Sequence, residues 1–293
     1  MRSATALQAF EFEPEQQLTA AEFTRIATLV EGHTGIRLPQ AKKVMLEGRL
    51  RKRVRAHGLS RFSEYCDLLF KSGKLEQELP TLIDVVTTNK TDFFREPDHF
   101  DVLTGHVLPD ILAQRRGSEA SPLVKVWSAA SSTGAEAYTL AMVLHDQAMM
   151  RRRFQFAILG TDISHTVLEQ GERAIYAADM MEPVPPHFRQ RYVMQSRKPQ
   201  ARAEVRIVPE LRRHVHFAHL NLMDESYPFD RDVDIIFLRN VLIYFERRDQ
   251  EAVVRRLTGH LHAGGYLFLG HSESMNGNTP GLRQIAPAVF QKI

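Results

Sequence analysis

The sequence predicts an α/β fold with a doubly wound, mostly parallel sheet, preceded by a separate helical domain. Two observations predict the sheet. An apolar run at 123–127 leads through small residues into a helical pattern, and a second apolar run at 156–161 ends in Asp162. Helical periodicity without strand signals over the earlier part of the chain predicts the helical domain.

Length and composition are those of an ordinary globular protein. The 293 residues allow about two domains, and 43% hydrophobic with 25% charged residues is typical of soluble chains. No apolar run approaches the roughly 20 residues that span a bilayer. Residues 1–17 lack an apolar signal core, so we expect a flexible N-terminus and a cytoplasmic location. Because no cysteine and histidine residues have zinc-site spacing, we expect no metal.

The helical domain is expected over residues 18–78. Thr19 is a candidate N-cap for an apolar stripe at 23–30, and further helices are expected at 40–58 and 62–70. The polar residues that follow place the domain boundary within about 71–85. A larger domain then occupies 79–293.

The second of these helices is strongly basic. Residues 42–55 hold seven Lys or Arg and one Glu, a local charge of +6, whereas the whole chain carries +3. An acidic partner is indicated: a nucleic acid, an anionic membrane or an acidic protein helix, although charged helix faces are often merely solvated. Membrane binding is disfavoured, because the opposite face is only three aliphatic residues wide and is needed for the core. Arg49, Lys52 and Arg53 share one face and are the candidate docking residues.

The turn after the first expected strand is a candidate ligand site. Small residues at 128–134 let a ligand approach the backbone, and the following helix directs free N–H groups at it. This is the usual ligand position of an open α/β sheet. Turns of this composition also occur without a ligand, so the next strand is needed to decide.

Asp162 ends that next strand, where a carboxylate can accept hydrogen bonds from both ribose hydroxyls of an adenosine. The alternative is that Asp162 caps the following helix. The turn is not the G-x-G-x-x-G of a dinucleotide site, and Glu136 beside Gly134 would repel phosphates. S-adenosylmethionine (SAM) fits, because it has an adenosine, a sulfonium and an ammonium and no phosphate.

The rest of the larger domain continues the α/β pattern. Two short β-like runs at 192–194 and 205–208 predict a small antiparallel insertion at about 190–210. Further sheet strands are expected at 215–217, 233–238 and 266–269, with a helix at 251–262 and a last antiparallel strand at 288–291. The 233–238 run is almost entirely apolar, which predicts a central strand.

Four blocks of sequence carry a resemblance to a known family. They are Thr88–Glu96 (TNKTDFFRE), Trp127–Gly134 (WSAASSTG), Leu238–Phe245 (LRNVLIYF) and Gly270–Ser274 (GHSES). Together they resemble the chemotaxis receptor methyltransferase family, CheR. The resemblance implies a Rossmann-like domain that transfers a methyl group from SAM to glutamate side chains of chemoreceptor cytoplasmic helices, for receptor adaptation in signal transduction. The family turn Cys-Ser-Thr-Gly-Glu-Glu-Pro-Tyr differs here at Ser131, Ala135 and Ala137, which bears on SAM affinity.

The resemblance also assigns site residues. It implies that SAM and its product S-adenosylhomocysteine contact Asn89, Thr91, Arg95, Ser132, Gly134, Glu136, Asp162, Asn221, Leu222, Arg239 and Asn240. Arg95 and Tyr244 are the candidate catalytic residues, with Arg95 orienting a carboxylate and Tyr244 contacting the substrate. The basic helix would dock the acidic helices of the receptor.

The sequence offers no obvious acid–base pair of side chains, and methyl transfer to a carboxylate requires none. Methyl transfer is an in-line displacement, and a glutamate carboxylate is already anionic at neutral pH, so positioning is the main task. Two alternatives remain: a SAM-binding scaffold without turnover, and a nucleic-acid methyltransferase. The Val184-Pro185-Pro186 segment opposes the latter, because Val184 cannot hydrogen-bond a base amine. We therefore expect a monomeric enzyme that binds neither nucleic acid nor the membrane interior.

Overall fold

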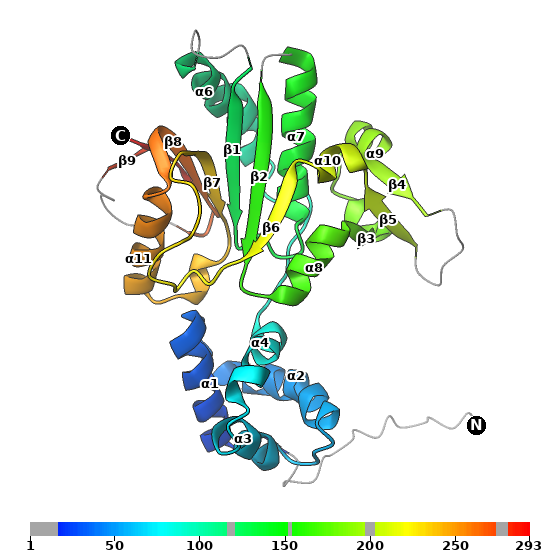
Figure 1. The fold of residues 1–293 in the computed structure, drawn as a ribbon, viewed down its shortest axis with the longest axis vertical. Helices are drawn as coiled ribbons and strands as arrows, with labels where there is room; N and C mark the ends of the chain where they lie inside the picture. Colours follow the sequence, from blue (N-terminus) through cyan, green and yellow to red (C-terminus); the bar gives the residue numbers. More distant parts are fainter. Residues whose placement is uncertain (1–16, 116–120, 152–153, 197–202, 274–280) are drawn as a thin grey trace, which may run out of the picture. The chain divides into compact units, whose positions relative to one another are not determined.

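The computed structural model describes residues 17–115, 121–151, 154–196, 203–273 and 281–293. The chain forms two compact units, Met1–Thr87 and Thr88–Ile293 (Figure 1). The expected flexible segment 1–17 lies outside the described residues except for Gln17. No helix in the described ranges is long and apolar enough to cross a membrane.

The first unit is all helical. Its elements are α1 (Ala20–Thr34), the 3-10 turn η2 (Gln40–Lys42), α2 (Lys43–Ala56), α3 (Phe62–Phe70) and α4 (Leu75–Val86). Thr19 caps α1 as expected: its hydroxyl accepts from the Glu22 N–H at 3.2 Å, and the Glu22 carboxylate accepts from the Thr19 N–H at 2.8 Å. Leu46, Leu50 and Val54 form the buried face of α2.

The division between the units falls later than residue 78. Leu82 and Val86 of α4 belong to the same buried cluster as Leu46 and Leu50 of α2. The apolar stripe of α4 therefore completes the helical core, and the polar residues at 71–74 are a turn inside this unit. The physical boundary follows Thr87.

The second unit contains a seven-stranded sheet in the order β6-β2-β1-β7-β8-β10-β9. Its strands are β1 (Leu123–Ala129), β2 (Gln155–Asp162), β6 (Val215–His219), β7 (Val233–Leu238), β8 (Leu261–Leu269), β9 (Leu282–Ala286) and β10 (Val289–Lys292). The first five run parallel, whereas β10 is antiparallel to both neighbours. Every residue of β7 is buried, as expected of a central strand. β9 was not predicted.

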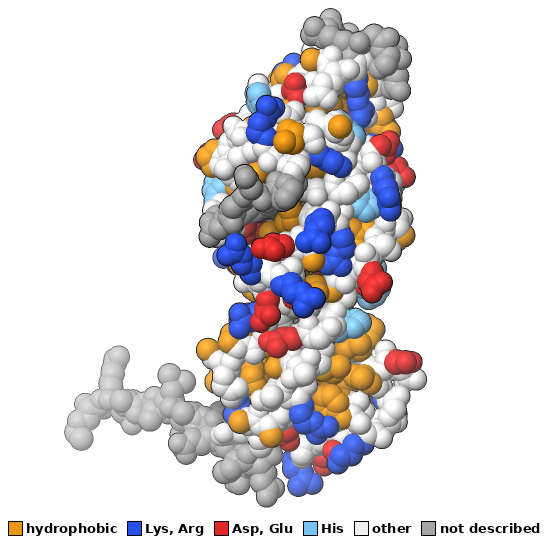
Figure 2. All heavy atoms as spheres, turned by 90° about the vertical axis from the view of Figure 1, so that its left-hand side faces the viewer, with side chains coloured by type: hydrophobic (Ala, Val, Ile, Leu, Met, Phe, Trp, Pro, Cys, Tyr) orange, Lys and Arg blue, Asp and Glu red, His pale blue; other side chains and the backbone are white. Residues whose placement is uncertain are grey.

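Helices precede the first strand and connect the strands. They are α5 (Asp98–Val102), the π-helical segment η3 (Leu103–Val107), α6 (Leu108–Gln114), α7 (Ala135–Arg151), α8 (His165–Arg173), α9 (Pro186–Tyr192), α10 (Pro209–Arg212) and α11 (Arg247–Thr258), with 3-10 turns η4 (Ala178–Met181) and η5 (Leu242–Tyr244). The helix expected at 251–262 is α11, which ends four residues earlier because β8 already begins at Leu261. On the face drawn in Figure 2, basic and acidic side chains are interspersed.

The insertion is a second, three-stranded antiparallel sheet in the order β3-β5-β4. Its strands β4 (Val193–Gln195) and β5 (Glu204–Ile207) are the two expected runs. The third strand, β3 (Ile175–Ala177), lies before the expected 190–210 range. It was missed because three residues give no alternation pattern, and the strand exists only through its pairing with β5.

Candidate functional site

The carboxyl ends of three adjacent strands assemble most of the predicted cofactor residues. β1 lies between β2 and β7, and all three are parallel, so Ala129, Asp162 and Leu238 end at one edge of the sheet. The loops leaving this edge carry Ser132 and Arg239.

The turn after β1 has an unusual backbone. Ala130, Ser132 and Gly134 all have positive φ, at 57°, 51° and 85°. Non-glycine residues in this region are strained, and such strain concentrates at functional sites. Gly134 is required for a second reason, because a Cβ there would lie 2.8 Å from Cζ of Phe217. The Ser132 hydroxyl also donates to the carbonyl of Asn89 at 2.9 Å, which joins the 89–95 segment to this turn.

Asp162 holds the turn in place. Its Oδ2 accepts from the Ser132 N–H at 2.8 Å, and its Oδ1 accepts from the Ser164 N–H at 3.0 Å. The side-chain cap of α8 is Ser164, whose hydroxyl accepts from Val167 N–H. A carboxylate oxygen can accept more than one hydrogen bond, so these contacts are compatible with ribose binding.

Arg239 is the centre of the charge network. Its side chain is 2% exposed, and the guanidinium donates from Nη1 to Oε2 of Glu136 at 3.3 Å and from Nη2 to Oε2 of Glu96 at 3.0 Å. It also donates to the carbonyl of Arg95. Oε1 of Glu136 accepts from the Ser128 hydroxyl at 2.7 Å. The structure thus pairs Glu136 with Arg239, two residues that the resemblance assigns to the cofactor, and adds Glu96, which lies in one of the four sequence blocks.

The two carboxylates have different electrostatic environments. Burial raises the pKa of Glu136, although the charge of Arg239 opposes this shift. Burial also acts to raise the pKa of Glu96, but the hydrogen bond from Asn240 and the charge of Arg239 outweigh it and leave that pKa below its usual value. Glu96 is therefore the firmer ionic partner of Arg239.

Asn240 adopts a left-handed conformation, with φ of 60°. Glu273, which is 6% exposed, holds this conformation by accepting from the N–H groups of Asn240, Leu242 and Gly270 at 2.7–2.8 Å. Gly270 is tightly enclosed, because a Cβ would lie 2.6 Å from Nδ2 of Asn240. Nδ2 also donates to Oε1 of Glu96 at 3.1 Å. Glu273 lies in the block Gly270–Ser274, but the sequence alone does not show that its carboxylate holds the backbone of Asn240.

The other predicted residues lie on segments near the same edge. Thr91, Arg95 and Tyr244 are half-buried; Arg95 donates to the Lys90 carbonyl at 3.4 Å. Asn221 and Leu222 follow β6, the strand beside β2, and both are buried. Each of these two residues accepts a local hydrogen bond, Asn221 Oδ1 from Met223 N–H and the Leu222 carbonyl from a tyrosine hydroxyl.

A histidine pair adjoins the Arg239 network. His99 is 1% exposed, and burial lowers its pKa to about 4. Its ring meets that of His271 edge-on, with centroids 4.6 Å apart. His271 is exposed.

The basic helix departs from expectation. Arg49 donates from Nη1 to the carbonyls of Val85, Val86 and Thr87, at 3.3, 2.7 and 2.8 Å, at the end of α4. Arg53 makes two hydrogen bonds to Glu78, at 2.8 and 2.7 Å. The expectation that Arg49, Lys52 and Arg53 form a free face is thus wrong for the two arginines, because α4 packs against α2 and supplies their partners. Lys52 is exposed.

Comparison with known proteins decides the family. The model of the CheR methyltransferase SAM-binding domain matches residues 89–289, and that of the CheR all-alpha domain matches residues 21–87. The chain belongs to the CheR methyltransferase family. It is 36% identical to the chemotaxis protein methyltransferase of Borreliella burgdorferi over 277 residues, covering 94% of this chain and 95% of the relative. It is 38% identical to that of Escherichia coli over 259 residues, covering 88% and 86%.

These matches confirm several expectations. The CheR chain is a SAM-dependent methyltransferase of chemotaxis with an N-terminal helical domain and a mostly parallel sheet. SAM is its cofactor and S-adenosylhomocysteine the product. The family match favours an enzyme over a SAM-binding scaffold and over a nucleic-acid methyltransferase.

Proposed function

We propose that this CheR protein forms γ-methyl esters on glutamate side chains of the cytoplasmic helical domain of chemoreceptors. It would act as a cytoplasmic monomer that contacts neither nucleic acid nor the membrane interior. The observation that carries the proposal is the charge network at the sheet edge, in which Arg239 links Glu96 and Glu136 beside the strained turn held by Asp162. The name shared by the matched relatives, chemotaxis protein methyltransferase, supports the receptor as substrate.

The hydrogen-bond acceptors at this edge fit SAM. Asp162 is a carboxylate at the end of β2, where its two oxygens can accept hydrogen bonds from a ribose diol, and Glu136 is a second carboxylate for an ammonium. We assign Asn221 and Leu222 to the adenine, and Arg239 and Asn240 to the methionine part. Ser132 and Gly134 form the turn that the cofactor approaches, and Asn89, Thr91 and Arg95 come from the segment beside it.

Bound SAM supplies a methyl group on a positively charged sulfur. The protein then needs to hold the substrate carboxylate in line with that group and to exclude water. Arg239 is already committed to two carboxylates and a carbonyl, which leaves Arg95 as the arginine for the substrate. Its planar fork suits a carboxylate. We assign Tyr244 to the same substrate group.

Receptor docking is assigned to the exposed bases of α2. Lys52 and Arg55 are exposed, whereas the guanidinium groups of Arg49 and Arg53 bind α4. An acidic helical partner would be attracted by the exposed charges. Arg49 and Arg53 would contribute by fixing the position of α2.

The direct test is incubation with isotopically labelled SAM and membranes that contain the receptors. The proposal expects label on the receptor that is released by mild base, as for a methyl ester. Arg95→Ala should lower methyl transfer much more than SAM affinity. Equal losses would mean that Arg95 holds the cofactor. Base-stable label, or label on another component, would contradict the glutamate ester.

The adenosine assignment is tested by Asp162→Asn, which preserves the shape of the side chain. Losing a hydrogen bond to a charged group costs about 1.5–3 kcal/mol, so the dissociation constant of S-adenosylhomocysteine should rise at least about tenfold. Circular dichroism of the variant checks that it is folded, because Asp162 also supports the turn after β1. An unchanged affinity in a folded variant would refute the assignment.

A further inference from the structure

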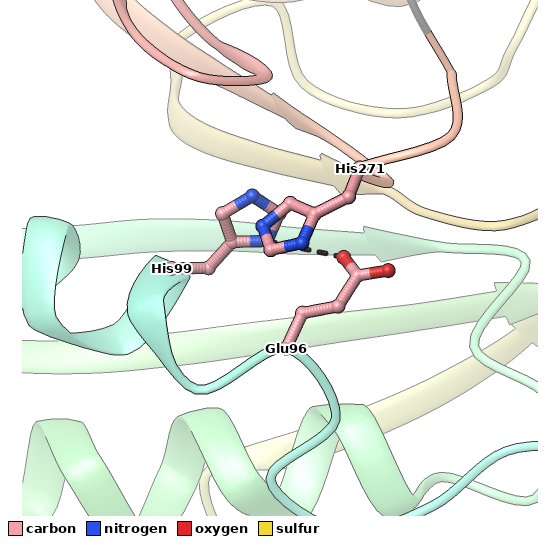
Figure 3. A group of neighbouring side chains, drawn as sticks. All are labelled: Glu96, His99 and His271. Carbon is pink, nitrogen blue, oxygen red and sulfur yellow. Dashed lines mark ion pairs between the residues drawn. The ribbon is translucent and has the colours of Figure 1, made fainter.

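Glu96, His99 and His271 bring three potential metal ligands together (Figure 3). One ligand atom from each lies within 4.8 Å of the other two. Glu96 lies two residues before α5, His99 lies in the first turn of that helix, and His271 lies two residues after the end of β8. Figure 3 shows the carboxylate and the two imidazole rings directed toward one another.

His99 lacks the hydrogen bonds that a buried imidazole needs. The residue is 1% exposed, and neither Nδ1 nor Nε2 has a hydrogen-bond partner among the described residues. Its Nδ1 lies 3.5 Å from Oε2 of Glu96, and the ring packs edge-on against Phe268. Unsatisfied buried polar atoms are uncommon in folded proteins, and binding of an ion is one explanation for them. Methyl transfer to a carboxylate requires no contribution from His99.

We propose that Glu96, His99 and His271 bind a zinc ion. Two imidazoles and one carboxylate are a ligand set that zinc accepts, with a fourth position left for water. Magnesium and calcium prefer sites made wholly of oxygen ligands, so they should not compete. The carboxylates of Glu96 and Glu136 accept from Arg239 and balance its charge beside this position.

The site has a consequence for the neighbouring network. Oε2 of Glu96 accepts from Arg239 at 3.0 Å, and its Oε1 accepts from Asn240 at 3.1 Å. A zinc ion on Oε2 therefore competes with Arg239 for the same oxygen. Zinc should loosen Arg239 and weaken the binding of S-adenosylhomocysteine, so the ion would inhibit the enzyme. This consequence rests on the proposed cofactor role of Arg239, whereas zinc binding itself does not.

The test is a calorimetric titration of zinc sulfate into the full-length protein in buffer free of chelators. We expect one equivalent to bind. Loss of a supporting residue around a metal typically costs about 10–100-fold in affinity, so loss of a ligand in His271→Ala should raise the zinc dissociation constant at least about tenfold. His271 is exposed, so this variant should fold. His106→Ala, at another exposed histidine of the same unit, should bind zinc like the wild type.

Two results would overturn the proposal: no stoichiometric zinc binding by the wild type, or equal binding by wild type and His271→Ala. Cobalt(II) gives a second readout, because visible absorption bands typical of the three-ligand site should appear in the wild type and in His106→Ala but not in His271→Ala. Measuring S-adenosylhomocysteine affinity with and without zinc tests the inhibition separately from zinc binding. If zinc binds through His271 and the affinity does not change, the zinc site stands and the cofactor role of Arg239 is wrong.

Discussion

Two arginine–glutamate networks, one in each unit, use the same chemistry differently. In the helical unit, Arg53 pairs with both oxygens of Glu78, which is 4% exposed and also accepts from the Tyr65 hydroxyl at 2.7 Å. In the methyltransferase unit, Arg239 divides its guanidinium between Glu96 and Glu136.

The surroundings distinguish the two networks. The Arg53 network lies between regular helices, and both oxygens of Glu78 are satisfied from within the unit. Beside Arg239, Phe94, Glu96 and Asn240 have positive φ, and His99 has two unsatisfied nitrogens. Strain and unsatisfied polar atoms persist where function requires them. We infer that the Arg53 network stabilises the fold and the Arg239 network binds ligands.

The largest expected effect comes from breaking the structural network. Arg53→Ala leaves the buried carboxylate of Glu78 without its main partner, which should lower the free energy of unfolding of the helical unit by about 3 kcal/mol. Urea denaturation followed by circular dichroism measures this. Lys52→Ala, at the exposed neighbour, should change stability by no more than about 0.5 kcal/mol. Equal stabilities of the two variants would mean that the Arg53 network does not stabilise the helical unit.

A smaller effect is expected from the residue that holds the strained Asn240. Glu273→Gln preserves the shape of the side chain but turns a donor toward N–H groups, which leaves a buried group unsatisfied at a cost of about 1–3 kcal/mol. The affinity for S-adenosylhomocysteine should fall about tenfold or more, as calorimetry would show. Glu251→Gln, on the exposed face of α11, is the control and should bind normally. If the two variants bind alike, Asn240 does not contribute to the cofactor site.

A third prediction concerns a structural ion pair at the opposite edge of the sheet. The hydrogen bond from His262 to buried Asp234, at 2.9 Å, raises the pKa of His262. A raised folded-state pKa stabilises the fold fully below the unfolded value near 6.5, and this contribution is lost as the pH rises through the folded pKa. Stability should therefore decline by less than about 1 kcal/mol between pH 6 and pH 8.

His262→Gln should flatten that pH dependence in thermal unfolding measured over the same range. S-adenosylhomocysteine affinity should be unaffected in the variant, because Asp234 is the second residue of β7 whereas the cofactor residues follow the end of that strand. If the stability of the wild type rises with pH over this range and the variant behaves in the same way, a group other than His262 controls the pH dependence.

An effect of similarly small size is expected at the docking surface. Lys52→Glu should raise the KM for receptor by up to about fivefold, since an exposed charge pair contributes up to about 1 kcal/mol. The effect should shrink with salt, because exposed charges are screened beyond a Debye length of about 8 Å. Lys74→Glu, also exposed in the helical unit, is the control. An identical KM for both variants in low salt would mean that the α2 surface is only solvated.

Sequence patterns could predict features that are local. The all-buried strand β7, the two insertion strands β4 and β5, and the turn between β1 and α7 were visible as runs of residue types. The helices of the first unit followed from their apolar spacing and from the Thr19 cap.

Features made by distant residues could not be predicted. Glu96 and Arg239 are 143 positions apart, and His271 reaches His99 from the other end of the domain, so no local spacing reveals either cluster. Arg49 and Arg53 looked like a free basic face because only the packing of α4 shows where their partners lie. The short strands β3 and β9 form only through pairing with β5 and β10.

The most direct test compares Glu136→Gln with Glu78→Gln, one variant from each network, by calorimetric S-adenosylhomocysteine binding and by thermal unfolding. Glu136→Gln should weaken binding by about 1.5–3 kcal/mol, the contribution of a hydrogen bond to a charged group, and should leave unfolding of the helical unit unchanged. Glu78→Gln should lower the unfolding temperature of that unit and bind S-adenosylhomocysteine normally. Wild-type binding by Glu136→Gln would contradict the assignment of the Arg239 network to the cofactor.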